Sequence, residues 1–385
     1  MQHRNNTVER LIVCQGTAQL VTAIAALREH IKRLDAPLPS SRDHLLICGL
    51  SVSEQQVEPF TQVIERMAAL LHPFASVLRL DDITLDSIVN SAKRCRDPIQ
   101  IAGLLHQWTG LSKMDEVFTV RNWQACNELA LSAYPEATHV CYGDSVGVNL
   151  PKGFVSPPVT PWSWAIAQVR RLLVPGKGLL DDPRVDINYL LLPYAFATPQ
   201  GEVVRTEAAV LRALFTNLKP LLDRTGLDLI RQRTTGRPVW VLLGTNFSEQ
   251  GLMAPEAEVS AYREWIKGMR PEPGAVLLIK SHPRDNPNKR ALLEKHLEGL
   301  FVEVLSVDAV GSAYLPVEVL LLDLMPIVGD LRCLTVSTAC LGTRLVVECK
   351  TEIGLGKSLV TRYFPPDRRQ TRLEHERDLR RLCMD

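Results

Sequence analysis

Short apolar runs alternate with amphipathic stretches along the first third of the chain. The run Arg10–Cys14 stops at the polar and small residues Gln15–Thr17, and Leu20–Arg33 then shows the spacing of an amphipathic helix. His44–Cys48 and Glu54–Leu71 repeat this order. Further strand-like runs follow at Val77–Leu80, Glu116–Val120 and Thr138–Tyr142. Strands that alternate with helices predict a parallel sheet covered on both faces.

The same alternation returns in the second half of the chain. A helical pattern over Glu207–Thr225 precedes the apolar run Pro238–Leu243. A second helical pattern, over Ala254–Met269, precedes the apolar run Ala275–Lys280. Later strand-like runs are Val302–Leu305, Val319–Asp323, Cys333–Val336 and Arg344–Val347, of which Val319–Asp323 fits a helix equally well. We therefore expect two α/β domains that face one another across a cleft, with the loops at the carboxyl ends of their strands forming the ligand site.

Prolines interrupt this alternation between residues 151 and 200. They stand at positions 151, 157, 158, 161, 175, 183, 193 and 199, together with tryptophans 162 and 164. This density suits neither helix interiors nor central strands, so we predict a connection with an irregular insertion, the alternative being an ordered loop within one domain. The predicted division is residues 1–200, residues 201–360 and a helical tail over 361–385.

Composition narrows the class of protein. The 44 basic and 43 acidic residues nearly cancel, which removes the general electrostatic argument for nucleic-acid binding. Nine cysteines without a C-x-x-C pair indicate reduced thiols in a cytoplasmic protein rather than a disulfide framework or zinc ribbon. The N-terminal apolar run is broken by polar residues, so we expect neither a secretory signal nor a spanning helix.

The C-terminal segment Thr361–Asp385 holds seven arginines against five acidic residues. A solvated helix with i,i+4 ion pairs is the simpler interpretation. Peripheral contact with an anionic membrane or an acidic glycan stays open as the alternative. The sequence does not predict an oligomeric state.

Common enzyme motifs are absent, and candidate chemistry stands instead at three strand ends. There is no G-x-G-x-x-G, Walker loop, H-E-x-x-H or G-x-S-x-G. His282 follows a buried-looking strand within Lys280–Arg284, where Pro283 fixes the backbone and an imidazole could donate to a phosphate. The alternative is a solvated strand end with an incidental histidine.

The second and third strand ends carry hydroxyls and a carboxylate. Ser337 and Thr338 precede an expected helix start, where hydroxyls and backbone N–H groups can hold a phosphate, although a plain N-cap explains them equally well. Asp144 lies in a loop bounded by Gly143 and Gly147, where a carboxylate can act as a general base, although a simple Asp-Ser turn would look similar.

Taken in order, these motifs resemble those of the bacterial CMP-sialic-acid-dependent sialyltransferases, in particular the polysialyltransferase and lipooligosaccharide sialyltransferase group. That family carries an acidic-acidic-Gly motif, a His-Pro motif and a Ser-Ser/Thr motif. Gly143-Asp144-Ser145, His282-Pro283 and Ser337-Thr338 stand here in the same order. At the first motif, Gly143 and Ser145 replace the family's first acid and its glycine, so that Asp144 is the matching acid.

Three further segments extend the resemblance over nearly the whole chain. Leu315–Val319 is similar to the family's Pro-x-Glu segment, and Leu242–Asn246 to the loop that opens its donor domain. Val13–Leu20 is similar to the family's first strand and loop. The resemblance implies a GT-B-like architecture, in which two Rossmann-like domains face each other across a deep cleft.

The resemblance also implies a reaction and a set of site residues. An inverting, metal-independent enzyme would move sialic acid from CMP-sialic acid to a glycan hydroxyl, with α-2,8 linkage and polymerisation among the outcomes. Asp144 would accept the acceptor proton and His282 would donate to the departing phosphate. The other implied residues are Pro283, Glu318, Ser337, Thr338, Gly244 and Thr245 for CMP, and Gln15, Gly16 and Thr17 for the sugar or acceptor.

Two alternatives remain from the sequence. One is a Kdo transferase that uses another CMP-activated ulosonic acid. The other is a catalytically silent nucleotide-binding or partner-binding module, which the single acid of the first motif keeps open.

Overall fold

The computed structural model describes residues 7–34, 40–50, 52–92, 94–95, 97–120, 125–143, 185–192, 201–283, 285–308 and 313–384. The chain divides into two compact units. Unit 1 comprises Met1–Ser51 and Ile64–Glu207, and unit 2 comprises Val52–Val63 and Ala208–Asp385.

Unit 1 is built on a parallel sheet with the strand order β3-β2-β1-β4-β5-β6-β7 in its described part. The strands are β1 (Val8–Cys14), β2 (Ser41–Cys48), β3 (Ser76–Leu80), β4 (Glu116–Thr119), β5 (Thr138–Gly143), β6 (Ile187–Leu190) and β7 (Glu202–Arg205). Every pair is parallel, and the central register sets Leu11 of β1 opposite His44 of β2 and Val117 of β4. Parallel strands have their carboxyl ends at one edge, so the loops that follow them gather there.

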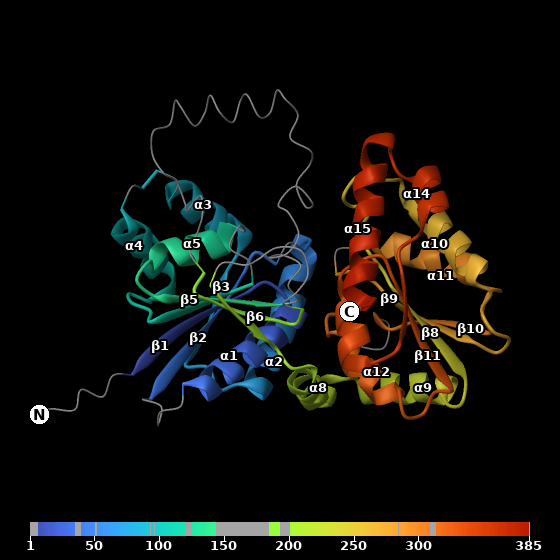
Figure 1. Ribbon diagram of the computed structural model, residues 1–385, viewed down its shortest axis with the longest axis horizontal. Coiled ribbons are helices and arrows are strands. Elements are labelled where there is room, and N and C mark those ends of the chain that lie inside the picture. Colours follow the sequence, from blue (N-terminus) through green and yellow to red (C-terminus); the bar gives the residue numbers. More distant parts are fainter. Residues whose placement is uncertain are drawn as a thin grey trace, which may run out of the picture. The chain divides into compact units, whose positions relative to one another are not determined.

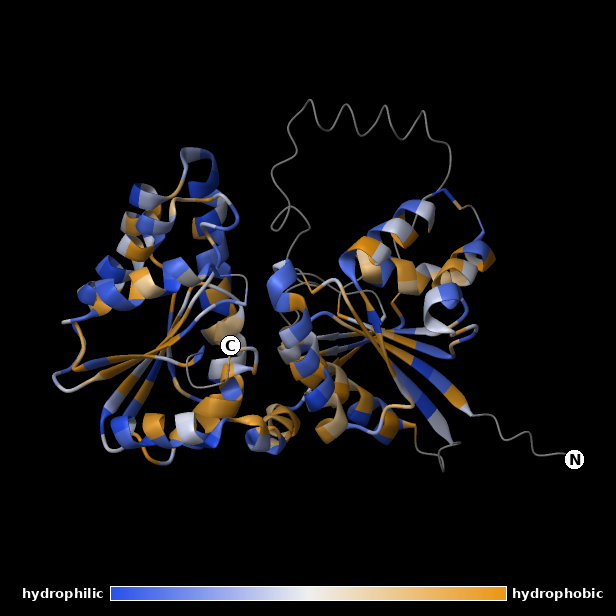
Figure 2. Cartoon of the chain, turned by 180° about the vertical axis from the view of Figure 1, so that it is seen from behind, coloured by the Kyte–Doolittle hydropathy of each residue, from blue (hydrophilic) through white to orange (hydrophobic). Residues whose placement is uncertain are grey.

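Helices cover both faces of this sheet. They are α1 (Thr17–Arg33), α2 (Glu54–Leu71), α3 (Asp82–Ala92), α4 (Pro98–Thr109) and α5 (Ala125–Ala133). Figure 1 shows α1 and α2 on one side of the sheet and α3, α4 and α5 on the other. Hydrophobic residues follow the strands and the inward sides of the helices in Figure 2. Leu11 and Val13 of β1 are fully buried in a core that they share with residues of α3, α4 and α5. Such burial is expected for strands that are covered on both faces.

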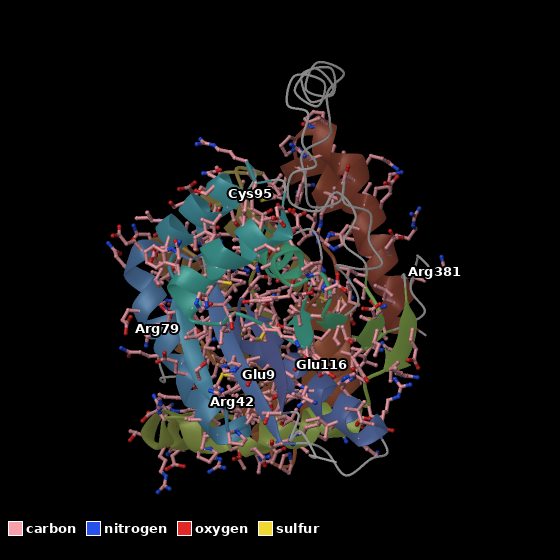
Figure 3. All side chains as sticks on the ribbon, turned by 90° about the vertical axis from the view of Figure 1, so that its left-hand side faces the viewer. Glu9, Arg42, Arg79, Cys95, Glu116 and Arg381 are labelled. Atoms are coloured by element: carbon pink, nitrogen blue, oxygen red, sulfur yellow. The ribbon has the colours of Figure 1, made fainter. Side chains whose placement is uncertain are left out.

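The amino ends of the unit 1 strands carry a buried charge network. Arg10 is fully buried and donates to Asp43 and Glu116, and His72 contacts the second oxygen of Asp43 at 2.7 Å. Burial alone would raise the pKa of Asp43, but the hydrogen bond from His72 and the Arg10 charge hold it below its usual value. Glu116, labelled in Figure 3, is the first residue of β4, whereas the candidate loops follow the carboxyl ends of the strands. We therefore assign this charge network to the stability of unit 1 rather than to the candidate ligand site.

Unit 2 repeats the design with a parallel sheet of order β10-β9-β8-β11-β12 in its described part. Its strands are β8 (Pro238–Leu243), β9 (Val276–Lys280), β10 (Glu303–Ser306), β11 (Asp330–Thr335) and β12 (Lys350–Ile353). Its helices are α8 (Ala208–Asn217), the 3-10 turn η2 (Lys219–Leu221), α9 (Arg224–Thr234), α10 (Pro255–Met269), α11 (Pro287–Leu297), α12 (Val317–Leu324), α13 (Ala339–Gly342) with the π-helical η4 (Thr343–Val347), α14 (Lys357–Tyr363) and α15 (Pro366–Met384).

The helices of unit 2 also form two layers (Figure 1). Helices α10, α11 and α14 pack over one face, around a core that includes Trp240 and Tyr262. On the other face, Arg231 of α9 holds Asp323 of α12 through two hydrogen bonds of 2.9 Å. The predicted α/β class, with two Rossmann-like parallel sheets in one chain as the GT-B-like design requires, is confirmed.

Two local predictions need correction, and one strand was not predicted. Arg344–Val347 is π-helical rather than a strand, because it continues α13 and packs against α8 and α12, and the strand follows at β12. Its β-branched residues misled the prediction, since tertiary packing overrides such preferences. The four residues of strand β6 lie in the proline-free segment between Pro183 and Pro193, inside the stretch expected to be irregular. Strand β7 was not predicted.

Candidate active site

The carboxyl edge of the unit 2 sheet gathers the predicted nucleotide-binding segments. Strands β9, β8 and β11 are neighbours in the sheet. His282 and Pro283 follow β9, Gly244 and Thr245 follow β8, and Ser337 and Thr338 follow β11. Segments almost a hundred residues apart along the chain therefore meet at one edge of one sheet.

Gly244 allows the loops after β8 and β9 to approach each other closely. Its N–H donates to the Lys280 carbonyl at 2.8 Å. A β-carbon at this position would lie 3.3 Å from Asp285 Oδ2 and 3.5 Å from the His282 nitrogen. The first contact is tighter than most β-carbons make, so glycine at this position eases the close approach of the two loops.

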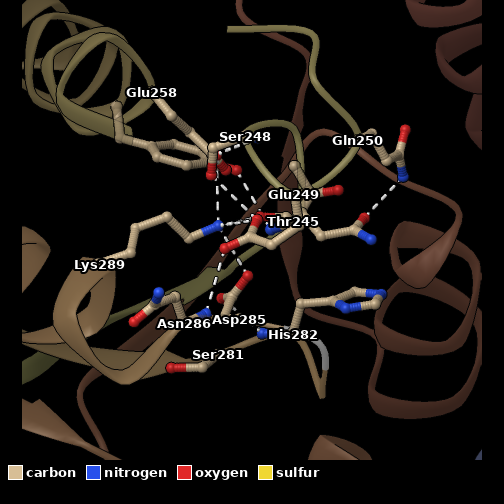
Figure 4. A network of polar contacts seen from close by, with 12 residues as sticks. Thr245, Ser248, Glu249, Gln250, Glu258, Ser281, His282, Asp285, Asn286 and Lys289 are labelled. Carbon is tan, nitrogen blue, oxygen red and sulfur yellow. Dashed lines mark hydrogen bonds and ion pairs between the residues drawn. The ribbon is translucent and has the colours of Figure 1, made fainter. Parts of the chain in front are cut away.

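Lys289 of α11 links the same two loops (Figure 4). Its ammonium lies 3.0 Å from the Thr245 carbonyl and 2.7 Å from Asp285 Oδ1. It also contacts Glu249 at 2.8 Å and Glu258 at 3.2 Å. We call Lys289 with these three carboxylates the Lys289 network. Burial raises the pKa of Asp285 to about 6 in spite of the neighbouring ammonium.

Glu318 is buried in the first turn of α12, against the segment that carries Ser337 and Thr338. A β-carbon on Gly342 would overlap the Glu318 carboxylate, so the helix after Thr338 passes directly over it. Burial raises the pKa of Glu318 to about 7, against the opposing effects of its own backbone N–H and of Lys280. Lys280 is itself paired with Asp308 at 3.0 Å.

The buried carboxyl of Glu318 makes stability depend on pH. The folded chain keeps the Glu318 proton up to about pH 7, whereas the unfolded chain releases it near 4.5. The stability of the native chain relative to Glu318→Gln should therefore fall by on the order of 3 kcal/mol as pH rises from about 4.5 to 7, and level off above. Urea unfolding of both proteins at pH 5 and pH 8 measures this difference. Parallel pH curves for the two would contradict it.

The described hydrogen bonds of the Ser337 hydroxyl are made within its own segment at the end of β11. Thr335 Oγ1 lies 3.3 Å from Ser337 Oγ and accepts the Ser337 N–H at 3.2 Å. Thr338 occupies the N-cap position of α13, yet its side chain makes no capping hydrogen bond. A plain N-cap by Thr338 therefore does not account for this residue, whereas Ser337 Oγ accepts the Ala339 N–H at 3.5 Å, as the N-cap alternative predicted for Ser337. The π-helical turn η4 that follows is a feature often found beside functional sites.

In unit 1, the first predicted loop lies at the carboxyl edge of the sheet. Gln15 follows β1, Gly16 is the N-cap residue of α1 and Thr17 is its first residue. The Gln15 amide nitrogen contacts Cys126 Sγ at 2.6 Å, while its Oε1 is buried without a hydrogen-bond partner among the described residues. An unpaired amide oxygen at a strand end suits a role in ligand binding.

Asp144 lies outside the described residues. Gly143, just before it, ends β5 with a φ of +134°, a conformation that favours glycine. Strands β1 and β5 flank β4 in the sheet, so Gly143 ends at the same edge where the Gln15–Thr17 loop begins.

Sequence reasoning missed several polar residues of the unit 2 edge. Asp285 stands three residues after His282, and Asp308 stands two residues after β10 ends. The strand-end rule that found His282 could have found Asp308 as well. Lys289 and Glu258 carried no such signal, because each lies inside a helix and reaches the edge only through its long side chain.

The described residues contain neither a metal-binding cluster nor a membrane-spanning helix. No cluster of three or more His, Cys, Asp or Glu side chains offers a metal site there. Among the described helices, none has both the length and the apolar character of a membrane span.

Several solved structures are similar to the chain at low sequence identity. UDP-GlcNAc 2-epimerase from Neisseria meningitidis is 12% identical, with a TM-score of 0.49 over 96% of this chain and 90% of that chain. UDP-GlcNAc 2-epimerase from Methanocaldococcus jannaschii is 9% identical, with the same TM-score over 96% and 91%. A family 9 glycosyl transferase from Veillonella parvula is 10% identical, with a TM-score of 0.34 over 98% and 97%. No curated protein sequence matches the chain.

One family model matches the middle part of the chain. Residues 179–327 match the model of the alpha-2,8-polysialyltransferases. The matched segment contains Gly244, Thr245, His282, Pro283 and Glu318, and it runs through most of the unit 2 edge described above. The resemblance to the alpha-2,8-polysialyltransferase family is thereby confirmed over residues 179–327, and the chain is a glycosyltransferase.

Proposed function

We propose that this glycosyltransferase moves sialic acid from CMP-sialic acid to a glycan hydroxyl, with inversion at the anomeric carbon and without a metal ion. The observation that carries the proposal is the convergence of His282, Ser337, Thr338, Gly244 and Thr245 at one sheet edge, with Glu318 packed beneath the last segment. A nucleotide with one phosphate and one ribose suits a site with one histidine, two hydroxyls and one carboxylate.

His282 is the proposed donor to the leaving group. In the reaction, the bond between the anomeric carbon and the phosphate oxygen breaks, and negative charge develops on that oxygen. A donor aimed at this oxygen stabilises the transition state more than the ground state. The turn at Pro283 fixes the backbone on which the imidazole stands.

The remaining unit 2 residues are proposed to hold the nucleotide. Ser337 and Thr338 would contribute hydroxyl and backbone N–H donors to the phosphate. Glu318 would accept from the ribose hydroxyls, and Gly244 with Thr245 would line the nucleotide where β8 ends. A monophosphate leaves with less charge than a diphosphate, so neutral donors and an imidazole can stabilise it without magnesium.

Asp144 is the proposed general base. The acceptor hydroxyl forms a bond to the anomeric carbon as CMP departs, and its proton passes to the Asp144 carboxylate. Gln15, Gly16 and Thr17 are proposed to contact the donor sugar or the acceptor, and the buried unpaired Oε1 of Gln15 supports this assignment.

Transfer assays in EDTA test the proposal. The purified chain is incubated with an acceptor panel and, in separate reactions, with CMP-sialic acid, CMP-Kdo and UDP-GlcNAc. We expect transfer from CMP-sialic acid alone, and an NMR spectrum of the product that shows inverted anomeric configuration. Transfer from CMP-Kdo alone would establish the Kdo transferase instead. CMP binding without any transfer would favour the catalytically silent module.

A further inference from the structure

We propose that Asp285 is a positioning residue for His282: it closes the turn on which His282 stands and is anchored through Lys289 to the loop after β8. The proposal rests on the proposed function, because it assumes that His282 acts on the leaving group. Asp285 itself would touch neither the CMP-sugar nor the acceptor glycan.

Asp285 makes two hydrogen bonds to the backbone of His282. The His282 N–H donates to Asp285 Oδ2 at 2.9 Å, and the Asp285 N–H donates to the His282 carbonyl at 2.9 Å. Together they close the turn that contains Pro283, whose own φ angle is fixed. The backbone from which the imidazole projects is thus held from both sides.

The second carboxylate oxygen of Asp285 is tied to the neighbouring loop. Oδ1 lies 2.7 Å from the Lys289 ammonium, which in turn holds the Thr245 carbonyl at 3.0 Å. His282 and Thr245 are thereby fixed relative to each other through two side chains. Figure 4 shows this chain of contacts, with the His282 imidazole pointing away from Lys289.

Burial makes this connection stiff. The side chains of Asp285 and Lys289 are 8% and 5% exposed, so water does not compete well for the ion pair. Glu258 fastens the other end of the network, because its Oε2 contacts Lys289 and accepts the Ser248 N–H at 2.8 Å. A geometric error of about 1 Å in a catalytic group can cost a hundredfold in rate.

The network also indicates which variants remain folded. Without the Asp285 carboxylate, Lys289 keeps Glu249, Glu258 and the Thr245 carbonyl as partners, so no buried ammonium is left unpaired. Asp285→Asn is milder still, since its amide oxygen can accept the His282 N–H. Thermal unfolding of both variants checks that they are folded, and the Asn variant replaces the Ala variant if the latter is not.

A double-mutant cycle separates positioning from a general structural role. We expect Asp285→Ala to lower kcat by about ten- to a hundredfold in the native background and by less than about twofold in a His282→Ala background. Asp285→Asn should lower kcat less than Asp285→Ala does, because its amide oxygen still accepts the His282 N–H although the ion pair with Lys289 is lost. Asp330→Ala is the matched control, because Asp330 is also paired with a lysine, Lys350, but stands at the amino end of β11. An equal loss in both backgrounds would overturn the proposal.

The rate of hydrogen exchange at the His282 amide can be measured without any CMP-sugar. Exchange should accelerate in Asp285→Ala and stay unchanged in Asp330→Ala. An unchanged rate in Asp285→Ala would overturn the proposal whatever the activity. A different outcome is accelerated exchange in Asp285→Ala together with no transfer from any CMP-sugar by the native protein. The hydrogen bond would then exist, but the proposed function would be wrong, and the proposed role of Asp285 in catalysis would be wrong as well.

Discussion

Replacement of His282 by alanine should lower kcat for transfer from CMP-sialic acid by about 10²–10³-fold, the usual cost of removing one donor to developing negative charge. The backbone N–H of residue 282 remains available to Asp285 in this variant, so the turn after β9 should persist. The loss should therefore reflect the missing imidazole alone, and the melting temperature should change little.

The matched control for this variant is His296→Ala. His296 lies on α11 and binds the Leu292 carbonyl of its own helix at 2.8 Å, away from the carboxyl edge. Steady-state kinetics should show native turnover for this control. Unchanged turnover and CMP affinity in His282→Ala would remove the histidine from the phosphate site.

Replacement of Asp144 by alanine should lower the transfer rate by about 10²–10⁴-fold, the usual contribution of general acid–base catalysis. The base acts on the acceptor hydroxyl, so the affinity for CMP should not change. This combination separates Asp144 from the residues proposed to hold the nucleotide, whose loss should weaken CMP binding as well.

Asp86→Ala is the matched control for Asp144, since Asp86 is an exposed aspartate on α3 of the same unit. Both variants are compared in single-turnover reactions and in CMP titrations. Retained transfer in Asp144→Ala would show that another group, or solvent, accepts the acceptor proton.

The strands and the sheet edge could be predicted from the sequence because their signal is local. Apolar runs such as Pro238–Leu243 end in small or polar residues, and parallel strands bring those ends together. His282 and Thr245 follow from this rule without knowledge of the sheet order. The helical form of Val319–Asp323 could not be predicted in this way, since a short apolar run fits both a helix and a strand.

The features that the sequence did not predict depend on contacts between distant segments. Arg344–Val347 has a strand-like composition but forms η4, because packing against α8 and α12 outweighs its intrinsic preference. The Lys289 network joins α10, α11 and two loops through side chains that no local pattern distinguishes from surface charges. Burial, which the sequence does not display, is what makes these charges matter.

The most direct test of the account is calorimetric titration of the purified chain with CMP and, separately, with UDP, both in EDTA. We expect CMP to bind and UDP not to bind, and we expect Ser337→Ala or Glu318→Gln to weaken CMP binding. Absence of CMP binding, or equal binding of UDP, would contradict the assignment of the unit 2 edge as a CMP-sugar site.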